Sequence, residues 1–383
     1  MVSEVGLAEK SRLDLAAMVK DRLTAIATQF SESGQVTQVE PLGNGNINDT
    51  FLVTLAPPSP DRFVLQRINT QVFQHPVRMM QNMRVLGEHI HQQLHQSPLA
   101  TRRWEVPQIR RSCTGADYWV DAQGSYWRAI GYIEAAESLE TLQTPTHAQE
   151  VGYALGLFHR LLSNLPSTQL ADTLPGFHIT PSYLDHYEQV LATGALRGTP
   201  EEKFCLQFVC DRAPWVTVLE TAKAQGKLPL RPIHGDPKVN NVMLDTTTGQ
   251  AVAMVDLDTV KPGLIHYDIG DCLRSGCNPL GEETLAWESV SFELDLAAAI
   301  LRGYIDQAQG FLTAADYAYT YDAIRLIAFE LGLRFLSDYL AGNVYFKVNH
   351  PDHNLARALV QFKLTESIEA QEHGLRAMIQ DLR

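Results

Sequence analysis

The sequence predicts an α+β fold in which a small unit with an antiparallel sheet precedes a mainly helical unit. Two observations lead to this prediction. Up to residue 134, apolar residues alternate over short runs that Gly, Pro and Asn interrupt, which is typical of antiparallel strands. Beyond that residue they recur at helical spacing, except in one hairpin at 232–258. We therefore expect an N-terminal helix plus β-rich unit at 1–134 and a mainly helical unit at 135–383.

The composition is that of a folded protein with small-molecule partners. The chain has 383 residues, of which 45% are hydrophobic and 20% charged, so it can bury two or three domain-sized cores. Its 31 basic and 44 acidic residues disfavour a nucleic-acid or anionic membrane partner. Because the sequence has neither a signal-like N-terminus nor a run of ~20 apolar residues, we expect a cytoplasmic protein.

The cysteines suggest reduced thiols. There are 5 of them, an odd number and few for this length, which argues against a disulfide framework. The spacing C-x4-C occurs at 205/210 and again at 272/277. Zinc binding by these four residues is an open alternative, although the usual C-x2-C spacing is missing.

Each unit has its own predicted elements. The first should contain helices at 13–30 and 76–95, and strands within 36–55 and at 62–68, 106–110, 118–121 and 126–132. The second should contain helices at 146–165, 182–191, 201–225, 287–307, 314–340 and 354–382. Gly43 and Gly45 lie in a polar tip between the first two strands, whose backbone N–H groups could cover phosphates. An ordinary turn is the alternative. Arg67 is a basic residue inside the third strand.

Most of the polar residues that could perform chemistry lie in the stretch 232–258. His234-Gly-Asp236-Pro-Lys238-Val-Asn240-Asn241 has the spacing H-x-D-x-x-x-x-N of the protein-kinase catalytic loop. In that arrangement Asp236 orients the acceptor hydroxyl and accepts its proton, and Lys238 reaches the transferring phosphate. Asn241 holds a metal ion through its amide oxygen.

Asp256 completes this arrangement. It follows a Val-Ala-Met-Val strand, as the metal-chelating aspartate of a kinase follows its own strand. Each residue alone has a structural alternative: a turn Asp at 236, an Asn at 241 that sets the hairpin register, and a helix N-cap Asp at 256. Their occurrence together, in order and between strands, favours the catalytic interpretation.

The sequence resembles the aminoglycoside phosphotransferase and choline kinase superfamily, and within it the N-acetylhexosamine 1-kinase group. The stretches that carry the resemblance span most of the chain: 42–51, 64–69, the His-Gly-Asp loop at 234–241, 256–260, 267–271, 334–340, 345–346 and 353–355. The resemblance implies a two-lobed protein-kinase-like fold, with a nucleotide-binding lobe at 1–134 and a catalytic and acceptor-binding lobe at 135–383.

The resemblance also assigns nucleotide contacts. It places Gly43 and Gly45 in the loop over ATP, and Arg67 where a kinase carries its phosphate-binding lysine. Arginine at that place retains the positive charge. The segment 131–134, with Ile133 and Glu134, corresponds to the hinge that binds adenine. Glu88 is a candidate partner of Arg67, and a surface glutamate is the alternative.

For the acceptor the resemblance points to Arg334 and Tyr345 beside Asp236. A structural ion pair of Arg334 with Glu330 or Asp338 on the same helix is the alternative. The sequence departs from the sugar kinases of the group at Asn46, where they often have His, and at Gly235, where they often have Asn.

These inferences predict an ATP- and Mg²⁺-dependent phosphotransferase that acts on a small-molecule hydroxyl. The expected acceptor is the anomeric hydroxyl of a hexose or N-acetylhexosamine. A choline/ethanolamine-type or aminoglycoside-type kinase and a nucleotide-binding pseudokinase are the alternatives.

Overall fold

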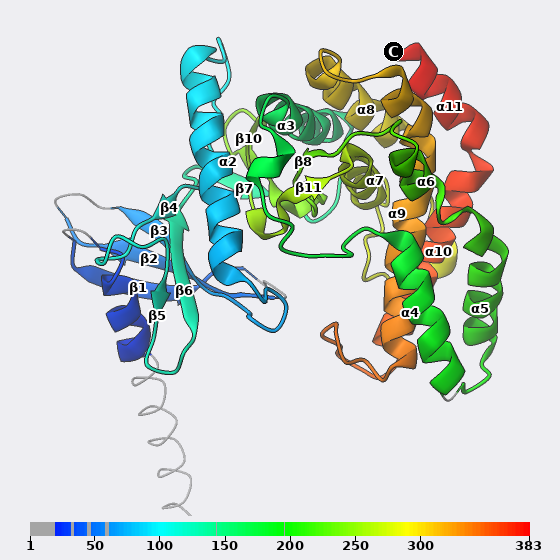
Figure 1. Cartoon of the computed structure of the whole chain (residues 1–383), viewed down its shortest axis with the longest axis horizontal. Helices are drawn as coiled ribbons and strands as arrows, with labels where there is room; N and C mark the ends of the chain where they lie inside the picture. The colour runs from blue at the N-terminus through cyan, green and yellow to red at the C-terminus, as the bar shows by residue number, and fades with distance from the viewer. Residues whose placement is uncertain (1–19, 32–33, 44–46, 58–60, 143, 195) are drawn as a thin grey trace, which may run out of the picture. The chain divides into compact units, whose positions relative to one another are not determined.

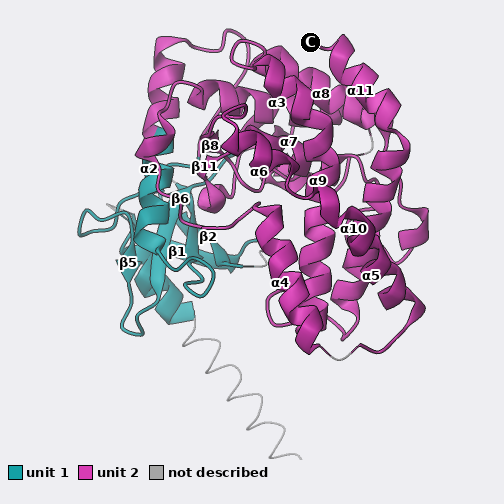
Figure 2. Ribbon diagram, turned by 45° about the vertical axis from the view of Figure 1, so that its right-hand side comes forward, with its two compact units in different colours: residues 1–87, 107–134 teal, residues 88–106, 135–383 magenta. Residues whose placement is uncertain are grey.

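The computed structural model describes residues 20–31, 34–43, 47–57, 61–142, 144–194 and 196–383 (Figure 1). It divides into two compact units, which are residues 1–87 with 107–134 and residues 88–106 with 135–383 (Figure 2). Each unit is described separately below.

The first unit is built on one antiparallel sheet. Its strands follow the order β1-β2-β3-β6-β4, and β5 pairs with β6. They comprise β1 (Val36–Pro41), β2 (Asp49–Leu55), β3 (Arg62–Arg67), β4 (Ile109–Arg110), β5 (Trp119–Val120) and β6 (Tyr126–Gly131). All the predicted strands occur, and β4 and β5 are shorter than expected. The predicted antiparallel N-terminal sheet is confirmed.

The core of this unit follows from the alternation within the strands. Phe63 and Leu65 of β3 and Trp127 and Ala129 of β6 are buried on one face of the sheet. Helical residues 20–28 contribute to the same core, for example through Ile26. The predicted helix at 13–30 is therefore confirmed over its described part, and its residues before 20 lie outside the description. The second predicted helix is α2 (Pro76–Gln96).

The second unit is mainly helical, as predicted. Its helices are α3 (Pro145–Leu162), α4 (Thr180–Thr193), α5 (Pro200–Arg212), α6 (Val218–Ala224), α7 (Ile265–Gly276), α8 (Leu294–Ala308), α9 (Ala314–Leu340), α10 (His353–Ala370) and α11 (Glu372–Asp381). Two short sheets accompany them: β8 (Arg231–Ile233) pairs with β11 (Lys261–Gly263), and β9 (Val242–Asp245) pairs with β10 (Ala251–Met254) and β7 (Ala136–Ser138).

Three of the predicted helices are wrong in extent. The helix predicted at 201–225 breaks into α5, a 3-10 turn at Ala213–Trp215 and α6, because Pro214 has no N–H to donate. The helix predicted from 287 begins at Leu294, since the N–H groups of Phe292 and Glu293 bond to Ser367 Oγ and the Cys277 carbonyl. The helix predicted at 354–382 breaks at 371 into α10 and α11.

Helix α7 was not predicted. Nearly all of its residues are buried, so the alternation of apolar and polar faces that reveals a surface helix is missing. Charged and polar residues such as Asp268 nevertheless lie inside it.

Helices α3 and α8 lie side by side and approach closely at two glycines (Figure 1). A Cβ atom at Gly152 of α3 would lie 1.9 Å from the Ile300 carbonyl oxygen, and one at Gly303 of α8 would lie 2.1 Å from the Gln149 carbonyl oxygen. At each of these contacts the helices can approach this closely only because the residue that faces the carbonyl oxygen has no side chain.

Replacing Gly152 with Ala is therefore expected to lower the free energy of unfolding by about 1–3 kcal/mol or more, because one helix must move. Urea denaturation measures this change. Gly310→Ala is the control, since a Cβ atom there meets nothing within 4 Å. An equal effect of the two substitutions would contradict the proposed close packing.

Candidate active site

The candidate catalytic residues lie on the segment that joins β8 to β9. His234 follows β8, Asp236 and Lys238 lie in the loop, and Asn241 ends a 3-10 turn at Val239–Asn241 just before β9. Strand β8 pairs with β11, whereas the expected hairpin is formed by β9 and β10. The loop is therefore anchored by two separate sheets.

Asp268 of α7 fixes the start of this loop through hydrogen bonds. Its carboxylate accepts the backbone N–H of His234 (2.7 Å) and of Gly235 (2.8 Å). His159 of α3 donates to the same carboxylate through Nε2 (2.8 Å). Burial alone would raise the pKa of Asp268, but these hydrogen bonds and the nearby histidines lower it. The sequence analysis assigned no role to Asp268 or His159. The acidic residue within the largely apolar run 264–273 is the feature of the sequence that could have indicated a role for Asp268.

Gly235 is required by the local geometry. Its φ is +86°, and a Cβ atom there would lie 2.7 Å from the Thr259 carbonyl oxygen. A side chain would strain the backbone and push against Thr259. The departure from the sugar kinases at this residue therefore has a structural cause in this chain.

His234 is buried and connects the loop to the end of β10. Its Nε2 lies 2.9 Å from the Val255 carbonyl oxygen, which can only accept, and its Nδ1 accepts the Asp236 N–H (3.3 Å). One nitrogen therefore donates and the other accepts, which is the pattern of a neutral imidazole. Burial lowers the pKa of His234, in agreement with the neutral form.

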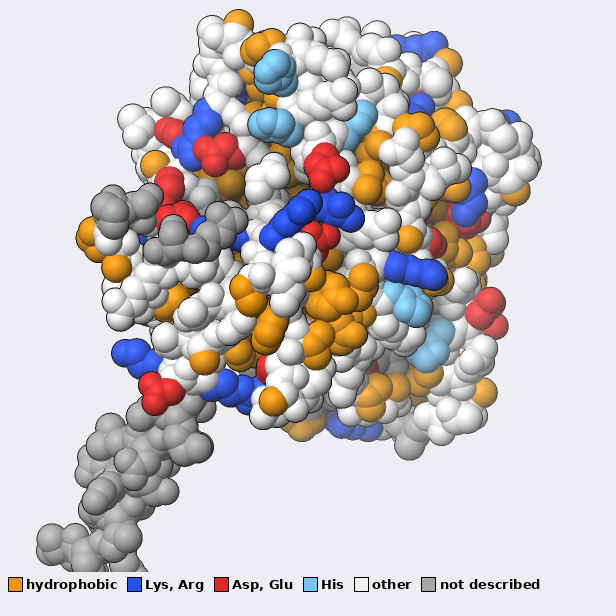
Figure 3. All heavy atoms as spheres, turned by 60° about the vertical axis from the view of Figure 1, so that its left-hand side comes forward, with side chains coloured by type: hydrophobic (Ala, Val, Ile, Leu, Met, Phe, Trp, Pro, Cys, Tyr) orange, Lys and Arg blue, Asp and Glu red, His pale blue; other side chains and the backbone are white. Residues whose placement is uncertain are grey.

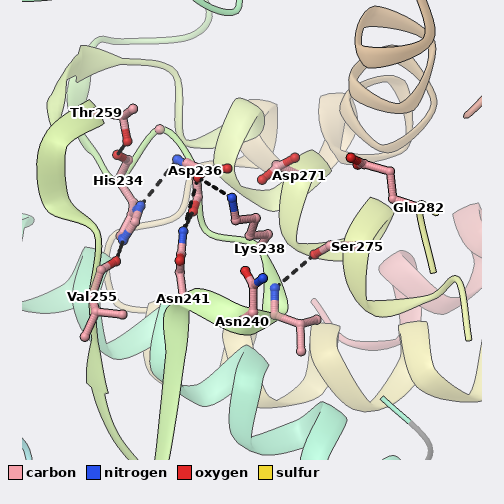
Figure 4. Close-up of polar contacts among 12 residues, drawn as sticks. His234, Asp236, Lys238, Asn240, Asn241, Val255, Thr259, Asp271, Ser275 and Glu282 are labelled. Atoms are coloured by element: carbon pink, nitrogen blue, oxygen red, sulfur yellow. Dashed lines mark hydrogen bonds and ion pairs between the residues drawn. The ribbon is translucent and has the colours of Figure 1, made fainter. Parts of the chain in front are cut away.

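The structure brings together Asp236, Lys238 and Asn241 (Figure 4). Lys238 Nζ lies 3.0 Å from Asp236 Oδ2, and Asn241 Nδ2 donates to the Asp236 carbonyl (2.7 Å) and to Oδ2 (3.2 Å). The side chains of Asp236 and Lys238 are 28% and 35% exposed, so a ligand can reach both. Burial would raise the pKa of Asp236, but Lys238 outweighs it and keeps that pKa below its usual value.

Asp256 belongs to the same site. It lies two residues after the end of β10, is exposed, and has a left-handed backbone (φ 62°), which Asp tolerates better than most residues. The pKa of Lys238 is raised mainly by Asp236, against the effect of burial, and further by Asp256 and Asp271. The charges of three carboxylates thus act on this ammonium group, and Asp236 is the one that forms an ion pair with it.

Asp271 and Arg274 of α7 form a buried ion pair of 2.8 Å next to this cluster, and Arg274 also contacts Glu282 (3.1 Å). Asp271 Oδ2 has no hydrogen-bond partner in the described part of the chain. Figure 4 places Asp271 beside Lys238. Asp271 and Arg274 thus form a local ion pair, and this pair lies next to the candidate catalytic residues.

Arg334 of α9 lies in an aromatic environment. Its guanidinium carbon is 5.3 Å from the Phe177 ring centroid, 5.1 Å from Tyr183 and 5.6 Å from Phe346. Burial works against its charge, but Tyr183, Glu330, Tyr345 and Asp236 raise its pKa. The negative charge of Asp236 is therefore one of the charges that stabilise the protonated guanidinium of Arg334.

The ion-pair alternative for Arg334 is wrong. Glu330 binds His178 and Thr180, and Asp338 accepts the N–H groups of residues 344–346. Within the described ranges, Arg334 forms no ion pair within 4.0 Å. Tyr345 is 58% exposed and stacks edge-on against Phe346.

The nucleotide contacts expected in the first unit are only partly described. Gly43 has φ +67°, as a tight tip requires, whereas Gly45 and Asn46 lie outside the described residues. Arg67 pairs with Asp49 across β2 and β3 (Nε to Oδ2 2.7 Å). The assignment of these residues to ATP stays a prediction.

The expected hinge follows β6. Ile133 is buried, and Glu134 is exposed and accepts a hydrogen bond from Arg62 Nε (2.8 Å). The binding of adenine by the segment 131–134 also stays a prediction.

Two further properties concern the whole described chain. No described helix is long and apolar enough to cross a membrane. All five cysteines are free, and in the described ranges no group of three or more His, Cys, Asp and Glu side chains could hold a metal ion. On the face shown in Figure 3, basic and acidic side chains lie next to one another.

Solved structures share this fold at low identity. An aminoglycoside phosphotransferase from Alicyclobacillus acidocaldarius has a TM-score of 0.61 at 16% identity and covers 93% of this chain and 96% of its own. A microcompartment-associated aminopropanol kinase has a TM-score of 0.61 at 15% identity, with coverage of 93% and 98%. An amicoumacin kinase in complex with AMP-PNP and Ca²⁺ has a TM-score of 0.56 at 15% identity, with coverage of 94% and 96%. These likenesses confirm the predicted protein-kinase-like fold.

The sequence itself matches the model of the phosphotransferase enzyme family over residues 38–312. This match includes the sheet of the first unit except for the first two residues of β1, and the whole candidate catalytic loop with Asp256. The chain belongs to the phosphotransferase enzyme family.

Proposed function

We propose that this protein transfers the γ-phosphoryl group of ATP to a hydroxyl group of a small molecule. The observation that carries the proposal is the convergence of Asp236, Lys238 and Asn241 on one accessible loop, with hydrogen-bond and ion-pair distances of 2.7–3.2 Å. Phosphoryl transfer requires a carboxylate for the acceptor proton and positive charge near the phosphate, and these residues supply both.

Asp236 acts as the base. Its pKa lies below the usual value, so the carboxylate is ionised near neutral pH and can accept a hydrogen bond from the acceptor hydroxyl. Lys238 is the nearest cation to that carboxylate. We infer that its ammonium moves between Asp236 and a phosphate oxygen of the bound nucleotide.

Asn241 and Asp256 are suited to hold Mg²⁺. The amide nitrogen of Asn241 is engaged by Asp236, so its carbonyl oxygen remains as the group for a metal. Together with the exposed carboxylate of Asp256 it forms a set of hard oxygen donors. Two protein ligands suffice, because Mg²⁺ normally takes its other ligands from phosphates and water. The ion would neutralise charge on the phosphates during transfer.

The surroundings of Arg334 support an uncharged, hydroxyl-rich acceptor. A half-buried guanidinium without a carboxylate partner repels a cationic acceptor and can donate several hydrogen bonds. The rings of Phe177, Tyr183 and Phe346 provide apolar faces of the kind that stack on sugars. A hexose or N-acetylhexosamine is therefore the acceptor class we propose, with phosphorylation at the anomeric hydroxyl.

A second acceptor class is favoured by the matched structures. Two of them are named for an aminoglycoside and for aminopropanol, which are amines. An amino alcohol would place its ammonium among acidic groups, and Asp271 and Glu282 lie near the catalytic loop. Arg274 lies between these two carboxylates, so it opposes this alternative.

The test is a turnover assay of the full-length protein with Mg²⁺ and ATP over matched panels of sugars and amino alcohols. Turnover of at least one sugar, with product phosphorylated at the anomeric oxygen by NMR, is the expected result. Turnover of amino alcohols alone would show that the acceptor is an amino alcohol and not a sugar. Absence of turnover on every hydroxylated acceptor would overturn the kinase proposal and favour a nucleotide-binding pseudokinase.

Arg334→Gln is expected to raise KM for the sugar by about 10- to 150-fold, because charge-assisted hydrogen bonds of this kind contribute about 1.5–3 kcal/mol. KM for ATP should change little. Steady-state kinetics with each substrate varied separately measure both values. Arg197→Gln is the control, since that side chain is exposed and pairs with Asp352. An unchanged sugar KM in Arg334→Gln would remove Arg334 from the acceptor site.

A further inference from the structure

His178 forms a buried link between α9 and the catalytic loop. It lies in the loop that precedes α4 and is 4% exposed. Its Nδ1 is 2.9 Å from Oε1 of Glu330, and its Nε2 is 2.7 Å from the carbonyl oxygen of Gly235. Gly235 immediately precedes Asp236, so the link ends next to the proposed base.

Both ring nitrogens of His178 face oxygen atoms. The Gly235 carbonyl has no proton to donate, and the second oxygen of Glu330 accepts from Thr180 Oγ1 (2.7 Å). With Glu330 as a carboxylate both ring nitrogens donate, so that His178 is the doubly protonated imidazolium. His234, which has one donor and one acceptor contact, is the neutral counterpart in the same site.

The two histidines hold opposite ends of one peptide group. His178 donates to the carbonyl oxygen of Gly235, and Nδ1 of His234 accepts the N–H of Asp236. Because the peptide is planar, fixing both ends fixes its plane and with it the position of the Asp236 Cα atom, from which the carboxylate side chain starts. Gly235 permits this orientation through its positive φ.

Other groups around His178 agree with a positive charge. The ring stacks on Tyr267 of α7 at 5.5 Å and lies 4.1 Å from Phe177. Burial alone would lower its pKa, but Glu330 outweighs burial, Asp271 adds to this effect, and the pKa is raised. Tyr183 of α4 lies against the His178 backbone, and the cation Arg334 is one turn further along α9 from Glu330.

The backbone of His178 is itself unusual. Its φ is +64°, a left-handed conformation that costs energy for a residue other than Gly, Asn or Asp. Such a conformation persists only where the surroundings hold it in place, and it is often found at functional sites. Here it directs the ring toward Glu330 and Gly235.

We propose that His178 is a positioning residue, whose charged ring ties Glu330 to the Gly235–Asp236 peptide and thereby aims the Asp236 carboxylate at the acceptor hydroxyl. This inference rests on the proposed kinase function. It also connects the base to Arg334, since Glu330 precedes Arg334 by one helical turn on α9.

The link should break at alkaline pH. Because the pKa of His178 is higher in the folded than in the unfolded protein, its contribution to stability is complete below the unfolded value near 6.5 and is lost as pH rises through the folded value. We therefore expect kcat to fall over the same alkaline range.

Kinetics against pH test the proposal with three variants. In His178→Asn, which tolerates the left-handed backbone, kcat should fall by about 10- to 100-fold at neutral pH, with KM for ATP unchanged and the alkaline decrease lost. In Glu330→Gln the alkaline decrease should shift to lower pH. His186→Asn, an exposed residue of α4, should match the wild type. An unchanged alkaline decrease in His178→Asn would overturn the proposal.

The protonation state can be measured independently of turnover. Histidine-labelled full-length protein would be titrated by ¹⁵N NMR, and the His178→Asn spectrum would assign the signal among the 13 histidines. An imidazolium that persists well above pH 6.5 is expected at residue 178, and a neutral ring at pH 7 would refute the link. This measurement needs no acceptor. If the protein shows no turnover, the kinase proposal fails, but the NMR titration still determines the protonation state of His178.

Discussion

Asp236→Asn is expected to reduce kcat by about 10²- to 10⁴-fold, the usual contribution of a general base. The amide retains the shape of the side chain and can still accept a hydrogen bond from the acceptor. It cannot take the proton, and it no longer attracts Lys238, which now lies 3.0 Å away. Binding of ATP should therefore persist while transfer stops.

The fold should tolerate this change. The ion pair between Asp236 and Lys238 is about a third exposed, so solvent screens it and its loss should cost less than ~1 kcal/mol of unfolding free energy. Single-turnover kinetics and thermal unfolding separate the two effects. Asp245→Asn, the same chemical change at the last residue of β9, should leave kcat unaltered. A rate near that of the wild type in Asp236→Asn would remove Asp236 from the reaction.

Asp256→Asn is expected to abolish the Mg²⁺-dependent part of nucleotide binding. Asn is preferred to Ala here because residue 256 has φ 62°, which Asn adopts at little cost. The substitution removes one negative ligand of the proposed metal ion while it leaves the backbone intact. Turnover should fall on the order of 10²- to 10³-fold, as when one electrostatic contact to the developing charge is removed.

Thermal unfolding with AMP-PNP, in the presence and absence of Mg²⁺, measures this effect. A nucleotide at 100 times its Kd stabilises the folded state by about 2.7 kcal/mol. In the wild type this stabilisation should depend on Mg²⁺, and in Asp256→Asn it should be equally small in both conditions. Equal Mg²⁺-dependent stabilisation of the two proteins would show that Asp256 is no ligand of the ion.

The sequence was a good guide wherever structure depends on neighbours along the chain. Alternation predicted the sheet of the first unit, and helical spacing predicted α3 and α9 within a few residues. The spacing between Asp236 and Asn241 placed them in one candidate site, and they are in contact because only one short loop and a 3-10 turn separate them. Breaks such as that at Pro214 were missed, since the apolar period continues across them.

Contacts between distant segments were beyond the sequence. Asp268 supports residues 34 positions earlier, and Glu330 reaches His178 across 152 positions. Buried polar residues of this kind show no periodicity, and each has many conceivable partners until the chain is folded. The Asn-to-Gly departure at residue 235 was visible in the sequence, but its cause, the carbonyl of Thr259, was not.

By itself, the sequence predicted a sheet-based unit followed by a helical one, and it singled out Asp236, Lys238, Asn241 and Asp256 as the candidate residues for phosphoryl-transfer chemistry. It did so because that chemistry uses a short segment with fixed spacing. Only the tertiary structure decided that Arg334 has aromatic neighbours in place of an ion pair, and that both ring nitrogens of His178 face oxygen atoms. Both depend on which groups surround a side chain, and those groups come from helices and loops far apart in the chain.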